Sequence, residues 1–135
     1  MSVLALDHVN IRTADLPATV AFFRDVLGLR ADVAPGAPSI DRGCWIYDPA
    51  NRPIVHIGPI DARYPSDSVH PFNPTTGSGA VHHVALECDD FDGMAAKLTA
   101  NSHAYTVNDI PQIGLRQMFV AEHNGVLLEL NFRSH

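Results

Sequence analysis

Two histidines lie at matching places in two similar stretches of this chain, and each is followed by a second polar residue at a similar distance. His56 comes 48 positions after His8, and Glu129 comes 46 positions after His83. Imidazole and carboxylate groups bind divalent metals, and two histidines with one carboxylate leave coordination positions open for substrate or oxygen. The sequence therefore predicts His8, His83 and Glu129 as metal ligands, with His56 as a fourth ligand or an acid/base group.

The four candidates share a local pattern that is typical of half-buried strands. Side chains alternate between the two faces of a strand, so each candidate lies opposite apolar neighbours. Glu129, for example, stands between Leu128 and Leu130, where an ionised carboxylate is costly to bury without a cation. We expect two small sheets that pack one face on helices and turn the other toward a shared polar cup that binds the metal.

Other polar residues near these stretches have weaker claims. Glu87 shares a face with His83 and is a candidate general base, whereas strand parity turns His82 to the opposite face as a structural residue. We expect His70, His103, His123 and His135, in loops or at ends, to be solvated. Two positions are possible for Asn10, Arg12, Gln117 and Asn131, which either line the cup or are ordinary polar residues at a sheet edge. The aromatic residues Trp45, Tyr47 and Phe119 either line a substrate pocket or belong to the core.

The first half of the chain predicts the element order β-α-β-β-β. A strand over residues 3–12 precedes a helix that Asp15 caps and Gly28 ends. Apolar residues spaced by four, three and four form one face of this helix: Leu16, Val20, Phe23 and Leu27. Three strands complete the half, at residues 29–33, 44–47 and 53–57.

The second half repeats this order, which indicates an internal duplication. Asp89 or Asp90 caps its helix, and Asn124-Gly125 predicts a tight turn before the last strand. Its strands are expected at residues 81–88, 103–108, 114–121 and 126–132. The expected organisation is one α+β domain over 1–135, with modules at 1–58 and 81–135 joined by a Pro- and Gly-rich linker at 59–80.

Composition narrows the partners. The net charge of −6 argues against nucleic acid and anionic membranes, and no apolar run reaches the roughly 18–20 residues that span a bilayer. A secretory signal pattern is missing. Cys44 and Cys88 are isolated in strand-like runs, which favours reduced thiols in a cytoplasmic protein.

Three motifs together resemble the glyoxalase/bleomycin resistance/dioxygenase group, the vicinal oxygen chelate superfamily. They are the paired openings at 7–11 and 82–86, the segment Phe-Phe-Arg-Asp-Val-Leu-Gly-Leu at 22–29, and the segment Asn-Gly-Val-Leu-Leu-Glu at 124–129. The resemblance implies two βαβββ modules around a divalent ion (Fe(II), Mn, Ni, Co or Zn), a small-molecule substrate with vicinal oxygens, and a homodimer.

The resemblance leaves several reactions open. In glyoxalase I-like lyases all four matching positions bind the metal, while in extradiol dioxygenases the position of His56 is a catalytic histidine. Those dioxygenases carry a Tyr where this chain has Phe119. The alternatives are a drug-binding resistance module, whose members generally lack the ligand set, and a metal-dependent transferase that opens an epoxide.

Overall fold

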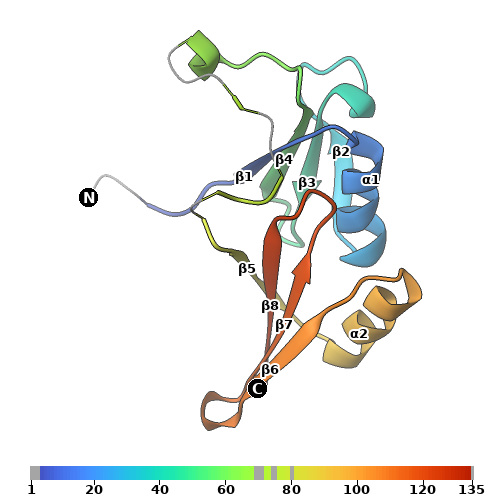
Figure 1. Ribbon diagram of the computed structural model, residues 1–135, viewed down its shortest axis with the longest axis vertical. Coiled ribbons are helices and arrows are strands. Elements are labelled where there is room, and N and C mark those ends of the chain that lie inside the picture. Colours follow the sequence, from blue (N-terminus) through green and yellow to red (C-terminus); the bar gives the residue numbers. More distant parts are fainter. Residues whose placement is uncertain (1–3, 69–71, 74–75, 80, 135) are drawn as a thin grey trace. The chain divides into compact units, whose positions relative to one another are not determined.

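The computed structural model describes residues 4–68, 72–73, 76–79 and 81–134, and it contains two four-stranded sheets (Figure 1). The chain divides into two compact units, Met1–Pro74 (unit 1) and Thr75–His135 (unit 2). The predicted α+β class is confirmed, with one βαβββ element order in each unit. Within the described ranges, no helix has the length and apolar character needed to cross a membrane. His70 and His135 lie outside the described residues.

Unit 1 holds one mixed sheet in the order β1-β4-β3-β2. The first strand runs parallel to the last, and the other two pairs are antiparallel. Its elements are β1 (Val9–Thr13), α1 (Leu16–Ala21), a π-helix (Phe22–Val26), β2 (Arg30–Val33), a 3-10 helix (Ile40–Arg42), β3 (Cys44–Tyr47), β4 (Pro53–Pro59) and a second 3-10 helix (Pro65–Ser68).

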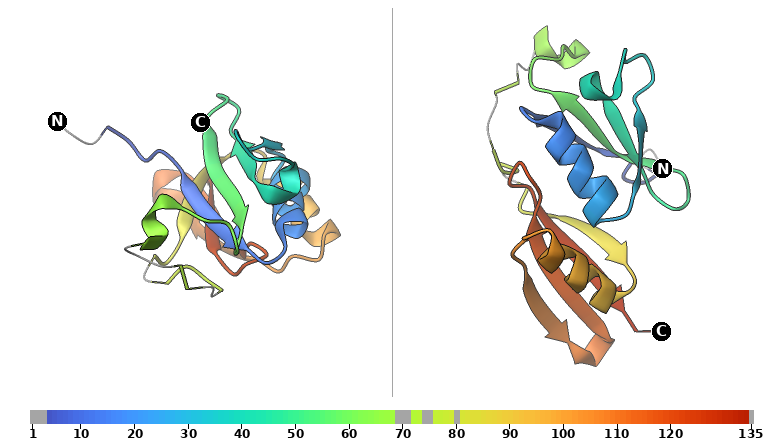
Figure 2. Two further views of the ribbon diagram at one scale, coloured as in Figure 1. Left: turned by 90° about the horizontal axis from the view of Figure 1, so that it is seen from above. Right: turned by 90° about the vertical axis from the view of Figure 1, so that its right-hand side faces the viewer.

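Unit 2 has the same topology, with the order β5-β8-β7-β6 and the same pattern of one parallel and two antiparallel pairs. In each unit the helix covers one face of its own sheet (Figure 2). The elements of unit 2 are β5 (Val84–Cys88), α2 (Phe91–Ala100), β6 (Thr106–Ile110), a 3-10 helix (Pro111–Ile113), β7 (Leu115–Ala121) and β8 (Leu127–Arg133).

The first helix begins as predicted but is not α-helical throughout. The Asp15 side chain accepts a hydrogen bond from the Ala18 backbone, and Gly28 follows the helix at φ 76°. Between them the helix widens into a π-turn, in which the Leu27 N–H donates to the Phe22 carbonyl at 3.1 Å. The extra residue of a π-turn rotates the face, so Phe22 is buried although the α-helical spacing leaves it out.

Both leading strands begin later in the chain than expected. The pairing of β1 starts at Val9 opposite Val55, so the predicted strand at 3–8 is wrong for the described residues 4–8. Likewise the pairing of β5 starts at Val84, not at residue 81. Strand β6 spans 106–110 rather than the expected 103–108. The residue that caps α2 is Asp90, not Asp89.

The core of unit 2 lies between α2 and the face of β8 opposite Glu129. Leu98, Met118 and Leu130 are fully buried there, and the Phe91 ring packs edge-on against Phe132 at 5.2 Å. The predicted Asn124-Gly125 turn is present, with Gly125 at φ 84°. This packing fixes which face of the sheet the polar side chains occupy.

Candidate metal-binding site

The strand pairing places the four candidate ligands at equivalent positions in the two units. In unit 1, His56 lies opposite Asn10, two residues after His8. In unit 2, Glu129 lies opposite Ala85, two residues after His83. The two pairs found in the sequence therefore have the same register within their own sheets.

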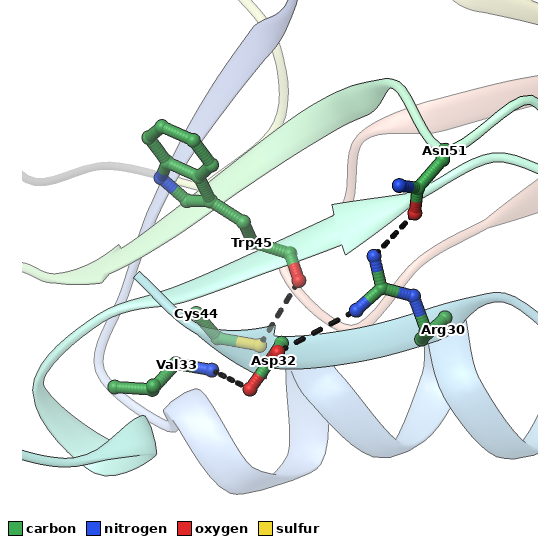
Figure 3. Close-up of polar contacts among 6 residues, drawn as sticks. All are labelled: Arg30, Asp32, Val33, Cys44, Trp45 and Asn51. Atoms are coloured by element: carbon green, nitrogen blue, oxygen red, sulfur yellow. Dashed lines mark hydrogen bonds and ion pairs between the residues drawn. The ribbon is translucent and has the colours of Figure 1, made fainter. Parts of the chain in front are cut away.

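In unit 1 the His8 and His56 side chains are stacked. Their ring centroids are 3.7 Å apart with an interplanar angle of 13°. On its other side the His56 ring stacks on Trp45, its cross-strand neighbour, at 4.1 Å and 7°. Figure 3 shows the Trp45 indole on the opposite side of β3 from the Cys44 thiol, which is buried in the core. His56 is thus held between two flat rings on the polar face of the sheet.

Nε2 is the ring nitrogen available to a ligand in both His8 and His56. Nδ1 of His8 lies 2.6 Å from an Asp7 carboxylate oxygen. His56 has a hydrogen bond with the Pro53 backbone, which has only a carbonyl to offer, so the imidazole is the donor. Among the described residues, Nε2 of His56 is buried and has no hydrogen-bond partner.

Burial keeps His56 neutral and able to donate a lone pair. It lowers the pKa of the imidazole below the ordinary 6.5, and the nearby His8 lowers this pKa further, while the bond to the Pro53 backbone acts in the opposite direction. A neutral imidazole with a free, buried Nε2 is the form that binds metals. The same group could accept a proton during catalysis.

The lowered pKa of His56 predicts acid sensitivity of the metal-free protein. Below pH 6.5 the unfolded state takes up a proton at this position more readily than the folded state, so the free energy of unfolding falls as the pH falls. Thermal melting in a chelator, between pH 8 and about pH 5, should show a smaller loss for His56→Gln than for the wild type. An equal fall of the melting temperature in both proteins would contradict a lowered pKa of His56 in the folded state.

In unit 2, His83 and Glu129 face each other. Nε2 of His83 lies 3.8 Å from Oε1 of Glu129, and the two side chains are 36% and 15% exposed. The other carboxylate oxygen, Oε2, accepts a hydrogen bond from the Asn131 amide at 2.9 Å. The pair therefore offers one nitrogen and one carboxylate oxygen side by side.

The other histidines of unit 2 and Glu87 have different outcomes. His82 precedes β5, so strand parity does not apply to it. Its Nδ1 lies 2.9 Å from Nδ1 of His83, and its predicted position on the opposite face is wrong. Glu87, the candidate base, is exposed on β5 opposite Asn131. His123 is exposed as expected, whereas His103 is half-buried.

The beginning of the expected linker packs against β1 in unit 1. Arg12 donates to the backbone carbonyls of Pro59 and Ala62, and its guanidinium lies 4.1 Å from the centre of the Tyr64 ring. Asn10 donates to the Tyr64 hydroxyl at 3.1 Å. The polar residues after His8 thus hold this segment against the sheet. Sequence patterns gave no sign of Tyr64.

Arg30 and its partners support the β2 edge of the unit 1 sheet. Arg30 on β2 lies 3.9 Å from the centre of the Tyr47 ring, so Tyr47 contributes to this edge rather than to a pocket. The same guanidinium pairs with Asp32 and donates to the Asn51 side chain (Figure 3). These contacts hold the turn between β3 and β4, on which the position of His56 depends.

The chemistry of the four candidate ligands fits a divalent ion. Across the described ranges, no group of three or more His, Cys, Asp or Glu side chains is close enough to hold a metal. Each unit brings one pair together. Three imidazoles and one carboxylate suit Zn, Fe, Co, Ni or Mn. Nε2 of His56 has no hydrogen-bond partner among the described residues, so its lone pair is free to bind a metal.

Two units with this strand order and with polar pairs in the same register define a duplicated βαβββ fold. A family model described as the Glyoxalase/Bleomycin resistance protein/Dioxygenase superfamily matches residues 5–130. Because this match covers nearly the whole chain, the protein belongs to that superfamily.

Individual relatives agree with this membership. The chain is 29% identical over 132 residues to a mitochondrial methylmalonyl-CoA epimerase of Dictyostelium discoideum, covering 93% of this chain and 76% of the relative. Among solved structures it resembles a lactoylglutathione lyase from Agrobacterium tumefaciens at 18% identity and TM-score 0.67, with 98% and 96% of the two chains covered. A glyoxalase/dioxygenase from Nostoc punctiforme has 17% identity and TM-score 0.68, with 100% and 99% covered.

Proposed function

We propose that this protein is a divalent-metal-dependent isomerase or lyase acting on a small molecule with neighbouring oxygen atoms. The observation that carries the proposal is the equal register of two polar pairs, His8 with His56 and His83 with Glu129. The similarity to an epimerase and the fold shared with a lyase favour this class over ring cleavage by oxygen.

In this proposal His8, His83 and Glu129 hold one ion, and His56 is either the fourth ligand or a proton-transfer group. The ion, when bound, acts as a Lewis acid on substrate oxygen. The protein then has to move a proton on the carbon beside that oxygen. Glu87 is the proposed base, since it is two residues after Ala85, the cross-strand neighbour of Glu129, and therefore shares a face of the sheet with Glu129.

A substrate panel tests the proposed class. It should contain 2-methyl-branched malonyl thioesters of coenzyme A, adducts of 2-oxoaldehydes with glutathione, and catechols. We expect isomerisation of a thioester or an adduct without oxygen uptake, loss of this activity in chelator, and recovery with Mn, Co, Ni, Zn or Fe(II). Turnover of catechols with oxygen uptake, and of nothing else, would replace the proposal with a ring-cleaving dioxygenase.

A homodimer is also part of the proposal. The edge strands β1 and β5 begin later in the chain than the sequence predicts. Before β1, Leu4 and Leu6 are 90% and 81% exposed, which leaves apolar surface for a second copy to cover. Sedimentation equilibrium should give about twice the 14.7 kDa chain mass. A single 14.7 kDa species at tens of micromolar would contradict this prediction.

The cytoplasmic location stays a prediction. It is supported by the two cysteines, since Cys44 and Cys88 are both free thiols, as expected in a reducing compartment.

A further inference from the structure

A row of amide side chains crosses the sheet of unit 2 beside Glu129. Asn108, Gln117 and Asn131 lie directly opposite one another on β6, β7 and β8. Asn131 is two residues after Glu129 on the same strand, so both side chains project from the same face. Gln117 and Asn131 are each only 9% exposed, and buried amides need specific partners.

The hydrogen bonds along this row all run in one direction, toward the carboxylate. Asn108 donates to the Gln117 side-chain oxygen at 2.8 Å, and Gln117 donates to the Asn131 side-chain oxygen at 3.1 Å. Asn131 in turn donates to Oε2 of Glu129 at 2.9 Å. An ionised carboxylate only accepts hydrogen bonds, so its presence at the end of the row fixes the orientation of each amide group.

The row also determines which oxygen of Glu129 is available. Oε2 is occupied by Asn131, whereas Oε1 lies 3.8 Å from Nε2 of His83. Rotation of the carboxylate would break the bond to Asn131, whose own oxygen is held by Gln117. The row therefore presents Oε1, and not Oε2, on the side of His83.

Unit 1 shows that the fold itself does not require the row. The position equivalent to Asn131 is two residues after His56, where the chain has Gly58. A side chain there would meet the Tyr64 hydroxyl, since a Cβ atom added to Gly58 would lie 3.3 Å from the hydroxyl oxygen. The row thus accompanies the carboxylate in unit 2 and is not a feature of every βαβββ unit.

We propose that Asn131, held by Gln117 and Asn108, is a positioning residue that makes Glu129 a one-oxygen metal ligand through Oε1. This inference rests on the proposed metal site and adds residues to it that do not touch the ion. Groups that orient metal ligands typically contribute about 10–100-fold to metal affinity.

Titration of the metal-free full-length protein with Co(II) tests the inference. The readouts are the dissociation constant, the visible absorption of bound Co(II), and the melting temperature without metal. Asn131→Ala should weaken Co(II) binding by about 10–100-fold and change the absorption spectrum. Asn101→Ala is the matched control, because Asn101 is an exposed amide of the same unit that donates to the Lys97 carbonyl at the end of α2. It should leave affinity and spectrum unchanged.

A second variant covers the case in which Asn131→Ala does not fold. Gln117→Met keeps the volume but removes the donor that holds the Asn131 oxygen, so Co(II) affinity should fall while the melting temperature shows a folded protein. Wild-type affinity and spectrum in either folded variant would overturn the inference and leave the metal site standing. A wild-type protein that binds no Co(II) would overturn both.

Discussion

Replacing Glu129 or His83 with alanine should remove the divalent ion from the purified protein. Each contributes one donor to a set of three or four, so the loss of one leaves too few ligands for tight binding. Because an ion that binds only the folded state stabilises it, the wild type should gain about 4 kcal/mol at an ion concentration 1,000 times the dissociation constant. Elemental analysis and melting curves with and without metal measure both effects.

The control for this experiment is His123→Ala. His123 is an exposed histidine in the turn before β8, and its removal should leave metal content and melting temperature unchanged. A His8/His83/Glu129 triple alanine variant that still carries one ion per chain would refute the site.

His56→Ala should have the second largest effect, and its form depends on the role of the imidazole. If His56 is a ligand, metal content should fall with activity. If it is an acid/base group, the metal should stay while turnover falls by about 10²–10⁴-fold. The buried, unpartnered Nε2 suits either role, so metal content and turnover must be measured on the same preparation.

Trp45→Phe provides the comparison for His56→Ala. It keeps an aromatic ring against the imidazole and should retain both metal and activity in larger measure than His56→Ala. Full metal together with wild-type turnover in His56→Ala would exclude both roles.

The duplicated fold could be predicted because its signals are local and repeated. Alternation of polar and apolar residues assigns Glu129 and Leu130 to opposite faces, and Asp15 and Gly28 mark the ends of a helix through their own backbone preferences. The matching distances from His8 to His56 and from His83 to Glu129 reflect equal strand register. These features need no knowledge of distant contacts.

The remaining features depend on contacts that sequence spacing does not encode. The first paired residues of β1 and β5 depend on contacts with β4 and β8, and the earlier start expected for β5 assigned a strand face to His82, which precedes that strand. The π-helix at Phe22–Val26 buries Phe22, which the α-helical spacing leaves off the apolar face. The Asp7 contact with His8 and the part played by Asn108 involve exact side-chain geometry, for which the sequence gives no periodic signal.

A crystal structure of the metal-loaded protein, with anomalous diffraction recorded at the absorption edge of the bound metal, tests the central claim most directly. We predict one anomalous peak per site, about 2.0–2.2 Å from Nε2 of His8, Nε2 of His83 and one oxygen of Glu129, with His56 beside it. A peak on other residues, or none at stoichiometric metal, would contradict the account.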